Sequence, residues 1–162
     1  MKIKHLFLCL LVLSLASVRG LAQSKSSLSQ SQTDSVAVMK TINGFVDAFV
    51  NLRWDDFSNY FADNATSFFP PSAKTPARAN NKVETMTIFR KVFDNARARR
   101  TSAPYLDIQP KDVRVQLIGS LAIVTFHLLD PDLFSRRTLV LSKEEQGSWK
   151  IVHMHGSGVA YK

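Results

Sequence analysis

Residues 113–157 read VRVQLIGSLAIVTFHLLDPDLFSRRTLVLSKEEQGSWKIVHMHGS, and their hydropathy pattern determines the architecture that we expect for the chain. Apolar and polar side chains alternate over residues 113–117, and apolar-rich runs follow at 121–129, 133–143 and 149–157. Turn residues separate these runs: Gly119-Ser120, Asp130-Pro131-Asp132 and Glu145-Gln146-Gly147. Period-two alternation between short turns is typical of antiparallel strands. The pattern therefore predicts a four-strand antiparallel meander.

The chain before Pro104 has a helical period instead. From about Thr33, apolar residues recur every three or four positions, which predicts a first helix. A short helix is expected after Trp54, ending at Asp63-Asn64, and a short strand at residues 65–69. A third helix should start after Asn81, where Asn and Glu stand at capping-box spacing. Three helices followed by a meander predict an α+β fold, and a strongly twisted sheet can wrap around helices and leave a cavity.

Residues 1–22 have the pattern of a secretory signal peptide. Lys2 and Lys4 precede an apolar run that is too short to span a bilayer well, and Gly20-Leu21-Ala22 offers small residues for cleavage. We therefore predict export to a periplasm or the extracellular space without stable membrane insertion; an uncleaved anchor is the alternative. Residues 23–33, rich in Ser and Gln, are expected to form a flexible tether, and residues 34–162 one domain.

Charge and cysteine content exclude several classes of function. The 162 residues include 21 Lys+Arg and 13 Asp+Glu, a net charge of +8. Removal of residues 1–22 lowers the net charge to +5 and removes Cys9, so disulfides and thiol catalysis are excluded in the mature chain. Nucleic-acid binding is not expected, because export removes the usual partner and the sequence contains no recognition motif.

Four segments carry a resemblance to a known superfamily. They are Tyr60-Phe61-Ala62-Asp63-Asn64-Ala65-Thr66, Ala122-Ile123-Val124-Thr125-Phe126, Arg137-Thr138-Leu139-Val140-Leu141 and the ending GSWKIVHMHGS at 147–157. With them, residues 34–160 resemble the NTF2-like superfamily, specifically its SnoaL-like members. The ending is similar to the association (hub) domain of calcium/calmodulin-dependent protein kinase II. The resemblance implies an NTF2-like cone-shaped barrel, with three N-terminal helices packed on a strongly curved antiparallel sheet. It also implies an internal pocket and a homodimer formed through the open sheet face.

The superfamily includes isomerases, cyclases and dehydratases as well as binding and oligomerisation modules, so the fold alone does not assign a function. Ketosteroid isomerase-like chemistry would need a carboxylate base at the position that Phe69 occupies here. The tyrosine of such enzymes falls near Phe45 or Val46, which are also apolar, so we do not expect this reaction. No catalytic residue is assigned; His127 and His155 are the candidates for acid–base chemistry.

The resemblance to the hub domain implies an arginine-lined pocket that could hold a carboxylate. The hub arginines fall on His127, on Gly156 and near Leu139, with Arg137 two residues away on the same strand face. His127 and Arg137 are therefore the residues that could keep part of an anion site.

His153 and His155 lie two residues apart in a predicted strand, so both should point to one face, about 6.5 Å apart. With His127 from a neighbouring strand they could form a three-histidine zinc site. However, no carboxylate is placed to orient the imidazoles. We therefore expect no metal and no cofactor, and expect the histidines to form hydrogen bonds between strand, loop and partner subunit.

The aromatic side chains are the largest remaining signal. Most should fill the core, while some should line an apolar cavity for a flat or greasy ligand. The predicted ligand-binding residues are Tyr60, Phe69, Phe89, His127, Arg137, His153 and His155. The favoured function is a dimeric module that binds a small apolar or aromatic molecule. The alternatives are an isomerase, cyclase or hydrolase that uses a pocket histidine, and a hub-like oligomerisation domain.

Overall fold

The computed structural model of the chain describes residues 30–70, 78–130 and 133–160. Residues 37–162 form one compact unit, and residues 1–36 belong to a separate unit, of which residues 30–36 are described and are helical. The predicted signal peptide lies outside the described residues. In the part of the chain that is described, no helix is both long and apolar enough to cross a membrane.

The described residues form three helices, as the hydropathy period predicted. The first covers residues 30–50, α2 covers Trp54–Asn59 and α3 covers Lys82–Arg99. Residues 30–33 are therefore helical, although the sequence analysis placed them in the tether; this polar segment contains no Gly or Pro that would stop the helix. The predicted cap of α3 is confirmed, because Asn81 Oδ1 accepts a hydrogen bond from the Glu84 backbone N–H at 2.9 Å.

The strands form one six-stranded sheet in the order β2-β1-β6-β5-β4-β3. Their bounds are β1 Phe61–Phe68, β2 Arg78–Ala79, β3 Pro110–Ile118, β4 Leu121–Asp130, β5 Leu133–Lys143 and β6 Trp149–Ala160. Strands β3 to β6 form the predicted antiparallel meander. Strand β1 pairs antiparallel with β2 but parallel with β6.

Two details of the prediction are wrong. The sheet is mixed rather than antiparallel throughout, because the alternation of side chains along a strand does not encode the direction of its partner. The second helix ends at Asn59 rather than at Asp63, and the strand after it begins at Phe61. The strand begins this early because the Tyr60 carbonyl accepts a hydrogen bond from the Ile151 backbone N–H of β6 at 2.8 Å.

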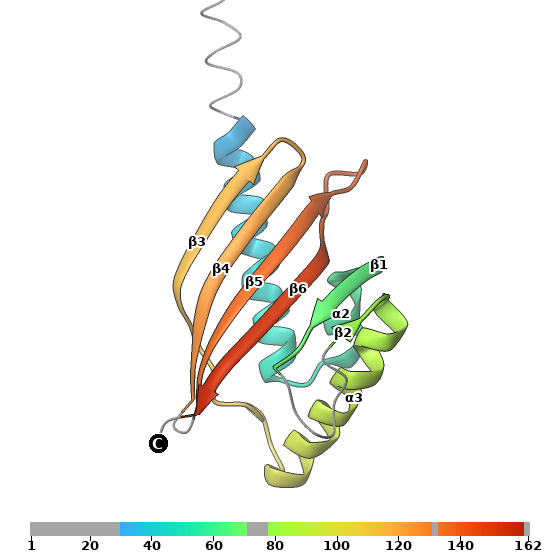
Figure 1. The fold of residues 1–162 in the computed structure, drawn as a ribbon, viewed down its shortest axis with the longest axis vertical. Coiled ribbons are helices and arrows are strands. Elements are labelled where there is room, and N and C mark those ends of the chain that lie inside the picture. The colour runs from blue at the N-terminus through green and yellow to red at the C-terminus, as the bar shows by residue number, and fades with distance from the viewer. Residues whose placement is uncertain (1–29, 71–77, 131–132, 161–162) are drawn as a thin grey trace, which may run out of the picture. The chain divides into compact units, whose positions relative to one another are not determined.

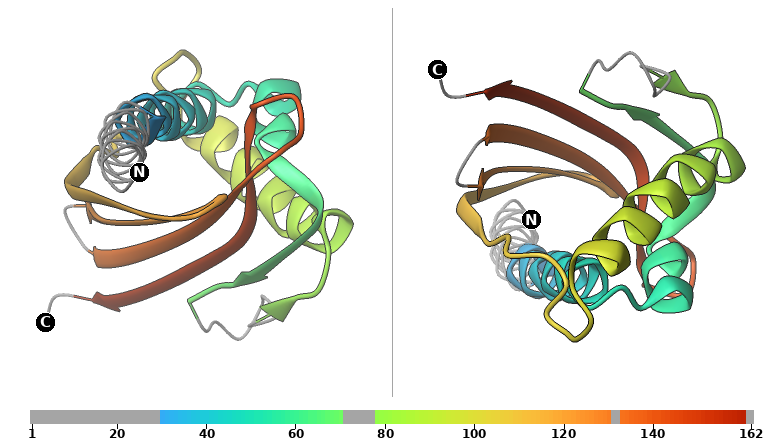
Figure 2. Two further views of the ribbon diagram at one scale, coloured as in Figure 1. Left: turned by 90° about the horizontal axis from the view of Figure 1, so that it is seen from above. Right: turned by 90° about the horizontal axis from the view of Figure 1, so that it is seen from below.

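The sheet curves around its helices without closing into a barrel, since β2 and β3 end it as edge strands (Figures 1 and 2). Strands β3 to β6 turn their concave face toward the first helix from residue 37 on, while α3 packs beside β1 (Figure 2). The α+β fold class is confirmed. Apolar side chains fill the space between helices and sheet; the largest that are fully buried include Phe57, Phe61, Phe93, Ile42 and Leu139. No helix of the described residues covers the opposite face of β3 to β6, which is called the open face below (Figure 1).

Candidate ligand-binding site

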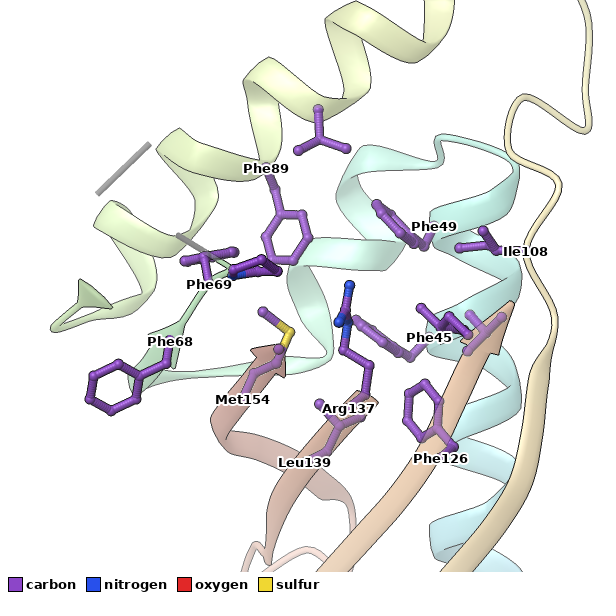
Figure 3. Close-up of a pocket in the computed structure, with 15 residues that line it drawn as sticks. Phe45, Phe49, Phe68, Phe69, Phe89, Ile108, Phe126, Arg137, Leu139 and Met154 are labelled. Atoms are coloured by element: carbon purple, nitrogen blue, oxygen red, sulfur yellow. The ribbon is translucent and has the colours of Figure 1, made fainter. Parts of the chain in front are cut away.

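A cavity of about 180 Å³ lies on the concave side of the sheet, between β4–β6, the first helix and α3 (Figure 3). Aromatic and aliphatic side chains make up nearly all of its wall. The lining residues are Phe45, Val46, Phe49, Phe68, Phe69, Pro70, Phe89, Val92, Ile108, Phe126, Leu128, Arg137, Leu139, Met154 and Gly156. Among these described residues, Arg137 is the one with an ionisable side chain, so the cavity is an apolar site with a single cation.

Strand register places the cation in the cavity. Phe126 on β4 is opposite Arg137 on β5, and Arg137 is opposite Gly156 on β6, so all three residues face the same side of the sheet. The next inward row contains Leu139 and Met154. In Figure 3 the Arg137 side chain rises from β5 into the space between Phe69 on one side and Phe45 and Phe49 on the other.

The guanidinium of Arg137 is tied to the backbone through one nitrogen. Its Nη1 donates to the Arg136 carbonyl at 3.0 Å and to the Ser157 carbonyl at 3.4 Å. Within the described residues, no carboxylate pairs with Arg137 and no hydrogen bond engages its Nε or Nη2. Burial lowers the pKa of the guanidinium, but an arginine in a protein stays protonated. The Nε/Nη2 edge is therefore a charged donor pair without a partner in this part of the chain.

Gly156 makes room for that guanidinium. A Cβ atom at position 156 would lie 3.0 Å from Arg137 Nη1, 3.2 Å from Arg137 Cζ and 3.3 Å from Pro70 Cδ. An arginine at this position, as in the hub domain, would compete with Arg137 for the same space. The Arg137 guanidinium on β5 therefore packs against the backbone of Gly156 on β6, which has no side chain.

The apolar wall is a connected set of aromatic rings. Phe89 of α3 meets Phe69 edge to face with ring centroids 5.5 Å apart, and meets Phe49 of the first helix at 5.7 Å. Phe45 stacks on the buried Phe57 of α2 at 5.2 Å. Rings in these arrangements hold one another in place, so the cavity wall is anchored in the core.

Three of the predicted ligand-binding residues meet at this cavity: Phe69, Phe89 and Arg137. Tyr60 does not line it. The Tyr60 ring packs edge to face on Phe45 with centroids 6.2 Å apart, and its hydroxyl lies against Gly44, where a Cβ atom would be only 2.1 Å from the oxygen. Tyr60 therefore supports the first helix from beside the cavity.

The three predicted histidines also lie outside the cavity. His127 alternates with the inward-facing Phe126 and Leu128 and points to the open face, where its Nδ1 lies 3.2 Å from an Asp112 carboxylate oxygen. His153 and His155 flank the inward-facing Met154 and share the open face. The acid–base hypothesis needed His127 or His155 in the cavity, and the geometry places both on the other side of the sheet.

The zinc arrangement is not formed either. Strand β5 separates His127 on β4 from the histidines on β6. The described residues contain no group of three or more His, Cys, Asp or Glu side chains placed to hold a metal ion.

Sequence reasoning missed Gly156, Met154 and Ile108 as lining residues. Strand parity could have identified the first two, because Met154 and Gly156 alternate with the histidines. Ile108 lies in the irregular segment between α3 and β3, where no periodic signal exists.

Solved structures with this fold come from several organisms. An NTF2-like protein of unknown function from Pseudomonas putida is 15% identical, with a TM-score of 0.63 over 78% of this chain and 87% of that one. A protein provisionally assigned as a ketosteroid isomerase, from Shewanella frigidimarina, is 21% identical, with a TM-score of 0.57 over 75% and 94% of the two chains. The CaMKII hub of S. rosetta is 26% identical, with a TM-score of 0.59 over 76% and 95%. No curated protein matches the sequence.

The sequence itself matches one family model. The match covers residues 38–162, which include the first helix from Val38 on, the whole sheet and every residue that lines the cavity. The three named neighbours share the same architecture of helices on a curved sheet, in agreement with the resemblance drawn from the sequence. The chain belongs to the family of SnoaL-like domains.

Proposed function

We propose that this domain is a binding module for a small, mostly apolar molecule that carries one carboxylate. The observation that carries the proposal is that Arg137 lines an apolar cavity, while its Nε and Nη2 have no hydrogen-bond partner and no acidic neighbour among the described residues. Two parallel N–H donors on one edge of a guanidinium match the two oxygens of a carboxylate. A carboxylate at this edge would neutralise the buried charge and satisfy both donors.

The size of the cavity limits the rest of the ligand. An apolar cavity of about 150 Å³ is large enough to hold benzene. The cavity here measures about 180 Å³, so it suits one ring, or a short branched chain, with a small acidic substituent. The surrounding phenylalanine rings favour a flat apolar body.

The composition of the wall favours binding over chemistry. Acid–base catalysis needs a group that can exchange a proton near neutral pH. Among the described residues that line the cavity, Arg137 is the titratable one, and it remains protonated. The positions that correspond to the base and tyrosine of ketosteroid isomerases are the apolar Phe69 and Phe45 or Val46.

The test compares an acid with its neutral isostere, 3-phenylpropionate against 3-phenylpropionamide, by titration calorimetry. Hydrogen bonds to charged groups contribute about 1.5–3 kcal/mol. The acid should therefore bind about 10- to 150-fold more tightly than the amide. Arg137→Met should abolish this preference while leaving amide binding in place.

Arg136→Met is the matched control, because Arg136 is the neighbouring residue on β5 and is exposed on the open face. It should keep the wild-type preference for the acid. Equal affinity of the wild type for acid and amide would refute the carboxylate. A loss of preference in Arg136→Met as large as in Arg137→Met would refute the role of the cavity arginine.

We also propose that the open face mediates a homodimer. Among the described residues, Ile118 (58%) and Leu121 (40%) are large apolar side chains exposed on this face, and Phe68 (41%) of β1 is exposed beside it, at the rim of the cavity. Half-buried Ile123 and Val140 lie beside each other between them. Burial of such a surface against a second copy removes apolar area from water. Sedimentation velocity should give a dimer at pH 7.5, and Val140→Lys should convert it to a monomer; a wild-type monomer at every concentration would refute the dimer.

Export is proposed on the pattern of residues 1–22 alone. The mature protein isolated from its own host should begin near Gln23. An N-terminus at Met1 in the isolated protein would refute cleavage.

A further inference from the structure

His153 and His155 form a compact cluster with two residues of β1 on the open face. Register places His153 opposite Thr66 and His155 opposite Phe68. The Nδ1 atom of His153 lies 2.8 Å from Thr66 Oγ1, within hydrogen-bond distance. The Phe68 ring lies 5.8 Å from the His153 ring and 6.0 Å from the His155 ring, measured between centroids. The histidine cluster, defined as these four residues, therefore has a fixed arrangement.

One arginine stands beside the cluster. The Arg78 guanidinium of β2 lies over the Phe68 ring, 5.7 Å from the ring centroid. Arg78 interacts electrostatically with the Glu84 carboxylate of α3. On β5, the residues directly opposite the two histidines are uncharged: Val140 and Thr138. Any proton added to the cluster thus joins existing positive charge.

Further charges stand on the same face at a distance from the cluster. Arg136 of β5 lies opposite Ser157, and Arg114 of β3 lies opposite Thr125. Asp112 is the acidic side chain that pairs with His127 there. Asp63 of β1 is directed to Lys82 of α3, with a distance of 3.5 Å between Oδ1 and Nζ. Among these described groups, none places a carboxylate against His153 or His155.

Histidines are suited to control this surface because their charge changes near neutral pH, whereas the charges of the arginines do not. Burial, and secondly the neighbouring His155, lower the pKa of His153, so its imidazole is neutral at pH 7. A second copy on the open face would bury the imidazoles further. Protonation would then place like charges from both copies in a region that has lost its solvent, which is unfavourable.

We propose that the histidine cluster is a proton-controlled lock on self-association: two copies join through their open faces while the cluster holds no added proton, and separate when it takes one up. The proposal rests on the proposed homodimer and adds its regulation. It assigns a role to His153 and His155, which do not line the cavity.

The test is sedimentation velocity of the mature chain from pH 8 to pH 5. If each copy takes up one proton on dissociation, the dimer dissociation constant should rise by up to about 100-fold for each pH unit below the pKa. The double variant His153→Gln/His155→Gln keeps a polar side chain for Thr66 but cannot titrate, so it should remain dimeric down to pH 5. His127→Gln is the control, since it removes a histidine of the same face outside the cluster, and should dissociate as the wild type does.

The outcomes separate the lock from the dimer. A wild-type dimer with the same dissociation constant from pH 8 to pH 5 would leave the dimer standing and refute the lock. A double variant that dissociates in acid as the wild type does would also refute the lock. A wild-type monomer at pH 8 would refute both proposals. Circular dichroism at pH 5 checks that each variant is folded, so dissociation is not confused with unfolding.

Discussion

The two faces of β5 and β6 differ in chemistry although their residues alternate along the same strands. On the concave face, Arg137 and Gly156 lie against aromatic rings and form a cavity. On the open face, Val140 of β5 is paired with His153 of β6, and the next histidine, His155, is paired with Thr138. A shift of one position in sequence therefore moves a side chain from the cavity to the open face. Within a strand, adjacent residues point to opposite faces, so residues that share a site are two positions apart and not one.

The largest expected difference between the faces is in stability. Leu141 is fully buried on the concave face of β5, and Val140 precedes it on the open face. Leu141→Ala should lower the free energy of unfolding by about 2–5 kcal/mol, because it removes transfer energy and leaves a cavity. Val140→Ala should cost about 1 kcal/mol or less in a dilute, monomeric sample. Urea unfolding of both variants at low protein concentration measures the difference.

Equal losses for the two variants would contradict the comparison, since they would mean that Val140 is covered within one chain. If Val140→Ala instead loses more free energy of unfolding as the protein concentration rises, the difference between the two faces becomes clearer. Such a dependence arises when association contributes to the stability of the folded chain.

A smaller effect is expected where the concave face is most tightly packed. Gly156→Ala would bring a Cβ atom to 3.0 Å from Arg137 Nη1, and the guanidinium is held there by two carbonyls. We expect a loss of about 1–2 kcal/mol in the free energy of unfolding, from overpacking. Binding of 3-phenylpropionate should weaken, because the donor edge is displaced. Thermal unfolding with and without the acid measures both effects.

Ser157→Ala is the matched control, because residue 157 follows on the open side of β6, opposite Arg136. It should change stability by less than about 0.5 kcal/mol. If Gly156→Ala is as stable as the wild type and binds the acid equally well, the guanidinium has room to move and the close packing described above is not required for binding.

The fold could be predicted from sequence because its signals are local. Alternation over residues 113–157 and the helical period before Pro104 both follow from burial on one side of an element. The capping pair Asn81 and Glu84 marks the start of α3 within one residue. The parallel pairing of β1 with β6 could not be predicted in this way, because it joins residues more than 80 positions apart and depends on where the chain returns.

The candidate site was predicted only in part, for a related reason. Phe69, Phe89 and Arg137, three of the seven residues predicted to bind a ligand, line the cavity. His127, His153 and His155 were grouped with them because they are chemically capable residues on neighbouring strands. Their inward-facing neighbours, such as Met154, are more apolar, and this alternation places the histidines on the other side of the sheet. Tyr60 follows α2 directly, where helical periodicity no longer determines direction.

On the open face, a single hydrogen bond gives a third, smaller effect. Thr66→Val replaces the hydroxyl that contacts His153 Nδ1 with a methyl group of similar shape. The expected cost is about 0.5–1.5 kcal/mol in the free energy of unfolding, the usual net value of one intramolecular hydrogen bond. Urea unfolding at pH 8 measures it. An unchanged free energy of unfolding would show that water replaces the hydroxyl as the partner of His153. The open face of the monomer would then be as solvated as the rest of the surface.

The smallest effect is the pH dependence of stability that His153 contributes in the monomer. Burial and His155 lower the pKa of His153 in the folded chain, so below its ordinary value of about 6.5 the unfolded chain takes up the proton first. Stability should therefore be complete above pH 6.5, fall as the pH drops toward the lowered pKa, and become level below it. His153→Gln should flatten this region of the curve, whereas His127→Gln should keep its slope. Melting temperatures between pH 8 and pH 5, at concentrations below dimer formation, measure the effect. If the melting temperature of His153→Gln still falls between pH 8 and pH 5 as in the wild type, the titrating group is a different residue. The histidine cluster would then not differ from the concave face in its response to protons.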